Sequence, residues 1–245
     1  YRWLFAMMIG VALLLAACAG EDSDDTSSFQ SDRTTSTRSS NTSRFTINES
    51  ALDQSKADSA LLTLISFPSG WTGSPYEESD LETIFSRQCQ LLGGDFGSEP
   101  TYTAYSQEFN GPDGEFAGHS VIIFGSIADA IDAMNGLVSA LERCLVELEN
   151  EFELLMRRDG IEVNVRSEEM SLTGFEPGLL GIRSGITFPG RSGTLIADQF
   201  FVRRSRMIAD LGFSYPFGEG PNDTSNRLLS RLIDTMRSRL EQAQE

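Results

Sequence analysis

Histidine and cysteine, the side chains that most often perform catalysis or bind metals, are scarce in this chain of 245 residues. A Ser-His-acid triad would have to use His119, the single histidine. The G-x-S-x-G elbow that presents such a serine is not found, because the nearest match, 212–216, ends in proline. Zinc sites need several Cys or His ligands, and the acidic clusters 22–25 and 168–169 lack the spacing of a calcium loop. The sequence therefore predicts no catalytic set, no metal and no cofactor, and we interpret His119 as a packing or surface residue.

The N-terminal apolar segment 3–17 leads into Leu15-Ala16-Ala17-Cys18. These four residues resemble the lipobox of bacterial lipoprotein signal peptides, in which the cysteine sulfur is lipidated and the preceding peptide bond is cut. The segment is shorter than the roughly 20 residues of a transmembrane helix, which is the alternative reading, and Arg2 fits the n-region of a signal peptide. Because the chain starts at Tyr1, we expect further n-region residues upstream.

The lipobox resemblance implies a signal peptide over 1–17 and a lipid bilayer contacted through acylated Cys18. It places the protein on the extracytoplasmic face of the cell membrane, with sorting to an outer membrane where the source has one. Once Cys18 is lipidated, Cys89 and Cys144 remain as a pair in an oxidising compartment, where a disulfide is expected. This disulfide would close a loop of about 55 residues and contribute about 4 kcal/mol. A reactive or metal-binding thiol pair is the alternative.

The chain is strongly acidic, with a net charge of −17 and a pI near 4.4. Nucleic-acid binding relies on basic groups that neutralise phosphate, so no nucleic-acid partner is predicted. Three arginines, Arg203, Arg204 and Arg206, nevertheless gather at the tip of a predicted hairpin. An anionic ligand or partner could dock there, and solvated charges are the alternative. The glycine-flanked segment 190–193 lacks a P-loop lysine and is interpreted as a strand connection.

Residues 18–50 are rich in Ser, Thr and Asp and offer little to bury, so we expect a disordered tether after the lipidated cysteine. The remainder, 51–245, is predicted to be a single globular domain. Its clearest periodic signal begins after Ser126, an N-cap candidate with Asp129 three residues on. Apolar residues then recur every three or four positions as far as Leu155, and Gly160 follows. This pattern predicts one long core helix, with a coiled coil as the alternative.

Shorter patterns on both sides of the long helix predict the remaining elements. Two short helices precede it, and a hairpin with turn residues at 110–114 leads into it. Four strands and a final helix follow. The predicted ranges are helices 50–65, 82–92 and 224–240, and strands 101–109, 115–124, 161–166, 179–188, 194–202 and 207–217. We expect an α+β fold, with a curved antiparallel sheet of about five to six strands packed by the long central helix and the C-terminal helix.

Several segments resemble the exported sensor-like domains of actinobacterial lipoproteins, of the type found in the PknH extracellular domain. They are 60–64 (ALLTL) leading into 67–72 (FPSGWT), the cysteine before the hairpin, the Ala-rich helix that carries Cys144, and 201–204 (FVRR). The resemblance covers most of 50–245. It implies a cleft that binds an unidentified ligand, and no catalysis.

Together these patterns predict a membrane-anchored, non-catalytic ligand-binding or sensing module. A structural or protein-interaction envelope lipoprotein, and an envelope hydrolase that uses carboxylates, remain open. Two convergent, desolvated carboxylates in a pocket would favour the hydrolase, whereas an apolar cleft with few polar groups would favour binding. A flat surface would favour the structural role. The partner is accordingly a small molecule or an envelope protein.

Overall fold

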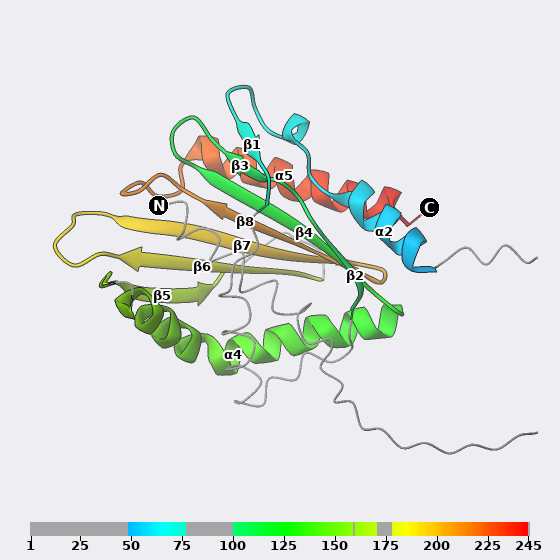
Figure 1. The fold of residues 1–245 in the computed structure, drawn as a ribbon, viewed down its shortest axis with the longest axis horizontal. Helices are drawn as coiled ribbons and strands as arrows, with labels where there is room; N and C mark the ends of the chain where they lie inside the picture. Colours follow the sequence, from blue (N-terminus) through cyan, green and yellow to red (C-terminus); the bar gives the residue numbers. More distant parts are fainter. Residues whose placement is uncertain (1–48, 77–99, 159, 171–177, 245) are drawn as a thin grey trace, which may run out of the picture.

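The computed structural model describes residues 49–76, 100–158, 160–170 and 178–244. Within these residues the chain forms an open antiparallel sheet of eight strands with three α-helices, shown in Figure 1. The strands are β1 (Thr72–Ser74), β2 (Pro100–Tyr105), β3 (Glu108–Asn110), β4 (Phe116–Phe124), β5 (Asn164–Glu169), β6 (Leu179–Thr187), β7 (Thr194–Arg204) and β8 (Met207–Ser214). The helices are α2 (Glu49–Ala60), α4 (Ile127–Arg158) and α5 (Asp223–Gln242), and a short 3-10 helix, η1, spans Leu64–Ser66. The fold is therefore α+β, as predicted.

The sheet has the strand order β1-β3-β4-β8-β7-β6-β5, and β2 also pairs with β4. It contains more strands than the predicted five to six because two short ones were not anticipated. One is β1, directly after Trp71. The other arises because the predicted strand 101–109 is divided at Ser106, whose hydroxyl accepts a hydrogen bond from the backbone N–H of His119. A side chain thus takes the place of a ladder partner, and β2 and β3 form on either side of it.

Each face of the sheet has its own apolar core. Along β4, Phe116 and Ile122 belong to the core shared with α4, whereas Val121 and Ile123 belong to the core shared with α2 and α5. This alternation follows from the two-residue period of a strand. Figure 1 shows α4 and α5 on opposite sides of the sheet. The structure is therefore a helix–sheet–helix arrangement in which all nine residues of β4 are buried.

The long helix has the ends that its sequence predicts. Ser126 caps the start, because its hydroxyl accepts a hydrogen bond from the N–H of Asp129 at 3.1 Å. At the other end Gly160 has a positive φ of 76°. The N–H of Gly160 bonds the carbonyl of Arg157, and that of Ile161 bonds the carbonyl of Met156, the pair that defines a Schellman C-cap. The core-helix interpretation of α4 is confirmed.

The first described helix is shorter than predicted. Helix α2 ends at Ala60 rather than near Ile65, and η1 follows it. The cause is a long-range contact, because the backbone N–H of Leu62 donates to Nδ1 of His119 at 3.1 Å instead of continuing the helical ladder. A local periodicity cannot reveal such a competing acceptor.

Several predictions fall outside the described residues. They include the signal peptide 1–17, Cys18, nearly all of the tether 18–50, and the helix 82–92 with Cys89. Cys144 lies on α4, but its side chain is also outside what the structure describes. Lipidation at Cys18 and the Cys89–Cys144 disulfide therefore stay predictions, as does the single-domain boundary.

Candidate functional site

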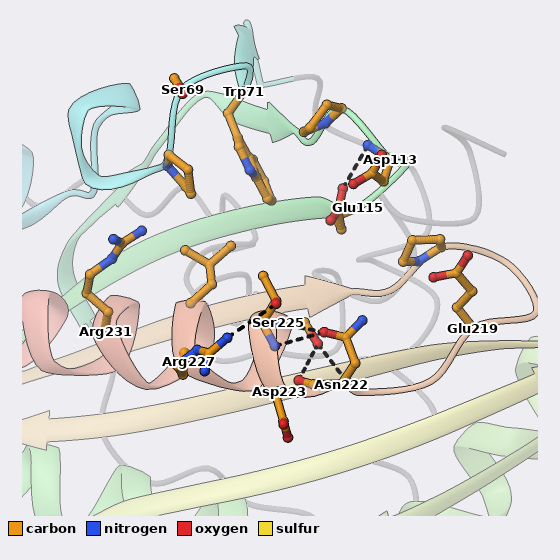
Figure 2. Close-up of a pocket in the computed structure, with 15 residues that line it drawn as sticks. Ser69, Trp71, Asp113, Glu115, Glu219, Asn222, Asp223, Ser225, Arg227 and Arg231 are labelled. Atoms are coloured by element: carbon orange, nitrogen blue, oxygen red, sulfur yellow. Dashed lines mark hydrogen bonds between the residues drawn. The ribbon is translucent and has the colours of Figure 1, made fainter.

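A groove of about 1330 Å³ lies where the N-terminal half of α5 meets the loop before β1 and the β3–β4 turn. Figure 2 shows its side chains, with Trp71 on one wall and the first turns of α5 on the other. Its apolar lining consists of Trp71, Leu228 and three prolines, Pro68, Pro112 and Pro216. Its polar lining consists of Ser69, Asp113, Glu115, Glu219, Asn222, Asp223, Thr224, Ser225, Arg227 and Arg231. The groove therefore combines an apolar wall with a polar rim, and with ten polar residues among fifteen it is more polar than a typical small-molecule site.

Trp71 is fixed by an aromatic cluster on the α5 side of the sheet. Its ring lies 4.7 Å from that of Phe67 and 6.1 Å from that of Phe213, measured between centroids. Phe67 in turn stacks on Phe109 at 4.2 Å. The backbone reaches this position through a turn in which Gly70 takes a positive φ of 95°. The indole is thus largely buried and held rigidly, with its remaining surface lining the groove.

The α5 N-terminus at the groove is already occupied by its own cap. The Oδ1 of Asn222 accepts hydrogen bonds from the N–H groups of Thr224 and Ser225 at 2.9 and 3.0 Å. Ser225 donates its hydroxyl proton to the Asn222 carbonyl and accepts from the Asn222 N–H, which completes a capping box. The helix end therefore does not need an anion to satisfy its first N–H groups.

Charge is distributed unevenly along the rim. Arg227 and Arg231, one turn apart on α5, are both exposed. Figure 2 shows them on the opposite side of the groove from Glu219 and Asp113. A carboxylate-based hydrolase would need two convergent, desolvated carboxylates, whereas Glu219 and Asp113 are exposed. The arrangement suits a molecule with an apolar body and charged or polar ends.

The three arginines predicted as a docking point do meet at the β7–β8 turn, but all three have partners in the fold. Arg203 donates to the carbonyl of Ser205 at 3.4 Å. Arg206 makes a two-pronged ion pair with Asp53 of α2 and also donates to the carbonyl of Phe124 at 3.0 Å. Arg204 lies 3.4 Å from Glu241 of α5. Both ion pairs, Arg206–Asp53 and Arg204–Glu241, join residues far apart in the sequence, so local patterns could not predict them. Anion docking at Arg203, Arg204 and Arg206 stays a prediction.

His119 is a buried packing residue on the α5 side of β4, 3% exposed. Its Nδ1 accepts the Leu62 N–H, so the proton of the neutral ring is on Nε2. Burial, with a smaller contribution from the charge of Arg239, lowers the pKa of His119 from 6.5 to about 3. This matches the interpretation of a lone strand histidine as a packing residue.

The depressed pKa of His119 makes stability depend on pH. Below pH 6.5 the unfolded chain binds a proton that the folded chain does not bind until about pH 3. Stability should therefore fall by up to about 1.4 kcal/mol per pH unit as the pH drops through this range. His119→Asn keeps an acceptor for the Leu62 N–H without titrating. Between pH 6.5 and 4.5 its unfolding free energy in urea should fall by about 2–3 kcal/mol less than that of the wild type. Equal pH profiles for the two proteins would contradict this assignment.

The structure also contains a buried ionic group of Arg183, Asp198 and Tyr215, which was not predicted from the sequence. Arg183 on β6 makes two hydrogen bonds of 2.7 Å to the carboxylate of Asp198 on β7. The hydroxyl of Tyr215 donates to the same carboxylate at 2.6 Å. Burial, then the negative charge of Asp198, raises the pKa of Tyr215 far above its usual value. The group joins three neighbouring strand segments and leaves no free acid or base, so its role is structural.

Among the described residues, no three side chains of His, Cys, Asp and Glu gather into a group that could hold a metal ion. None of the described helices is both long and apolar enough to cross a membrane.

The described chain is thus an α+β domain built on an open antiparallel sheet with a groove at one helix end. No protein-family model matches the sequence, and no curated protein matches it either. Among solved structures it is similar to the extracellular domain of PknH from Mycobacterium tuberculosis, with 10% sequence identity and a TM-score of 0.41. The match covers 75% of this chain and 96% of that one.

Proposed function

We propose that this protein is a non-catalytic, extracytoplasmic ligand-binding or sensing module, anchored through lipidated Cys18, and that the groove beside Trp71 is its binding site. The observation that carries the proposal is the groove's composition. A rigid indole and Leu228 form an apolar wall, and exposed charged groups surround it. An amphipathic molecule would place its apolar body there and keep its polar ends in the rim.

The described residues support catalysis less well than they support ligand binding. Of the four carboxylates of the groove, Asp113, Glu219 and Asp223 are exposed and Glu115 is half-buried. The one histidine is buried on the sheet, with Nδ1 occupied by the Leu62 N–H. General acid–base chemistry needs a titrating group within hydrogen-bond reach of the substrate. Recognition without reaction is therefore the function that this geometry supports best.

Native mass spectrometry of the protein released from its own membrane fraction tests the proposal. The wild type should carry an additional bound mass. Leu228→Glu places a carboxylate on the apolar wall and should lose that mass. Val146→Glu is the matched control, because Val146 is 62% exposed on α4, on the other side of the sheet, and this variant should retain it. A wild type without bound mass, or a Leu228→Glu variant that keeps it, would contradict the groove as the binding site.

A further inference from the structure

The rim of the groove beside Trp71 carries two arginines whose charges the described residues do not neutralise. Arg227 and Arg231 lie one turn apart on α5, and both are exposed and line the groove. Arg227 donates a long hydrogen bond of 3.5 Å to the hydroxyl of Thr224. Neither guanidinium forms an ion pair with a described residue. Like charges four residues apart on a helix repel each other, so this pair indicates an anionic group on the ligand.

Carboxylates occupy the opposite part of the rim. Glu219 and Asp113 are exposed, and Figure 2 shows them across the groove from the two arginines. Within the described part of the chain, no ion pair joins either carboxylate to Arg227 or Arg231. The groove thus separates positive from negative charge instead of neutralising them internally. It is complementary to a ligand that carries one charge of each sign, at opposite ends.

The other two carboxylates of the groove have roles within the fold. Glu115 is half-buried, and its Oε2 accepts the backbone N–H of Asp113 at 3.1 Å in the β3–β4 turn. Asp223 lies in the first turn of α5, where a negative charge stabilises the helix. We therefore assign Glu115 and Asp223 to the structure, and Glu219 and Asp113 to the ligand.

The size and lining of the groove suit a peptide better than a compact small molecule. Its volume of about 1330 Å³ exceeds the roughly 300–1,000 Å³ of typical small-molecule pockets. Ser69, Asn222 and Thr224 are exposed on its lining and offer hydroxyl and amide groups. A peptide has a donor and an acceptor on the backbone of each residue, and such groups can pair with them. Trp71 and Leu228 provide apolar surface for its side chains.

We propose that the ligand of this groove is a short peptide with apolar side chains and free, charged ends. Its terminal carboxylate lies between Arg227 and Arg231, and its terminal ammonium group lies beside Glu219 and Asp113. The apolar side chains of its middle residues pack against the wall that contains Trp71. This inference rests on the proposed function, because it names the class of ligand for the same groove.

Calorimetric titration of the full chain with three forms of one peptide, Ala-Leu-Leu-Ala, tests the inference. The form with free ends should bind saturably with a Kd of about 1 mM or tighter. Acetylation of its N-terminus removes the positive charge, and amidation of its C-terminus removes the negative charge. Each modification should weaken binding by about tenfold. Equal affinities for the three forms, or no saturable binding of the free form, would overturn the inference.

Two variants that remove a charge assign the two ends of the peptide. Arg231→Gln should weaken binding of the free form by about tenfold and leave the amidated form unchanged, because the amidated form has no carboxylate. Glu219→Gln should weaken the free form and leave the acetylated form unchanged for the corresponding reason. Arg157→Gln, at an exposed position on α4 across the sheet, changes the net charge as Arg231→Gln does and should leave all affinities unchanged. If Arg231→Gln weakens the free and amidated forms equally, the carboxylate does not lie at α5 and the inference fails.

The native mass spectra of the wild type and Leu228→Glu separate this inference from the proposed function. If Leu228→Glu loses a bound mass that the wild type carries, but the three peptides do not differ, the groove binds a ligand of another class and only this inference fails. If the wild type carries no bound mass and no form of the peptide binds, the proposed function fails as well.

Discussion

Replacing Asp198 with alanine is expected to lower the free energy of unfolding by about 3–5 kcal/mol. The carboxylate is fully buried and receives two hydrogen bonds from Arg183 and one from Tyr215. Its removal leaves the guanidinium, 30% exposed, and a buried phenol without their acceptor. Breaking one side of a buried pair costs more than the pair contributes, because the remaining group keeps its desolvation penalty. Urea denaturation followed by circular dichroism measures the loss.

Asp234→Ala is the control for the Asp198 variant. The Asp234 side chain is 72% exposed and lies 4.0 Å from Arg237, one turn away on α5. Exposed pairs contribute about 0–1 kcal/mol, so this variant should be nearly neutral. Equal losses for Asp198→Ala and Asp234→Ala would show that the buried group is not a stabilising centre of the sheet.

The second large effect is expected from Arg206→Ala, at about 2–3 kcal/mol. Arg206 connects the β7–β8 turn to α2 through Asp53 and to β4 through the Phe124 carbonyl. The Asp53 side chain is 6% exposed and would remain as a buried carboxylate bonded to Thr101 alone. We place the loss below that of Asp198→Ala because the Arg206 side chain retains 27% exposure and is partly screened.

The Arg206 variant should also change the acid sensitivity of the fold. The hydrogen bond from Arg206 is the main cause that lowers the pKa of Asp53. A depressed folded-state pKa stabilises the protein above the unfolded value of 3.8, and this contribution is lost as the pH falls through the folded value. Arg206→Ala should therefore show its largest deficit at neutral pH and a smaller one near pH 3. Arg157→Ala, at an exposed position near the end of α4, should match the wild type at both pH values. A deficit that is the same at pH 3 and pH 7 would mean that the ion pair is not its cause.

Local sequence patterns predicted the elements whose signals lie within one segment. The Ser126 cap and the recurring apolar residues predicted α4, and turn residues predicted the β3–β4 hairpin. The final helix formed with Asn222 as its cap, next to the predicted start at 224. Each of these signals depends on residues only a few positions apart, so the sequence contains all the information needed.

Contacts between distant segments were not predictable in the same way. The Asp53–Arg206 pair spans 153 positions, and the bond between Leu62 and His119 spans 57. The groove beside Trp71 was missed because it combines a loop, a hairpin turn and a helix start. One signal for it was available: the tryptophan directly after Pro68-Ser69-Gly70, which the structure places in the groove wall.

Whether the groove beside Trp71 binds a ligand can be measured through the fluorescence of Trp71 itself. The chain has two tryptophans, and Trp3 lies in the predicted signal peptide, so Trp71 is the single tryptophan of the mature protein that begins at Cys18. Titration with 1-anilinonaphthalene-8-sulfonate, an apolar molecule with one anionic end, should quench Trp71 saturably by energy transfer. Adding Leu228→Glu to this protein should weaken the apparent affinity by about tenfold or more. Trp71 emission that does not respond to the dye, or an affinity unchanged by Leu228→Glu, would show that the groove is not the binding site.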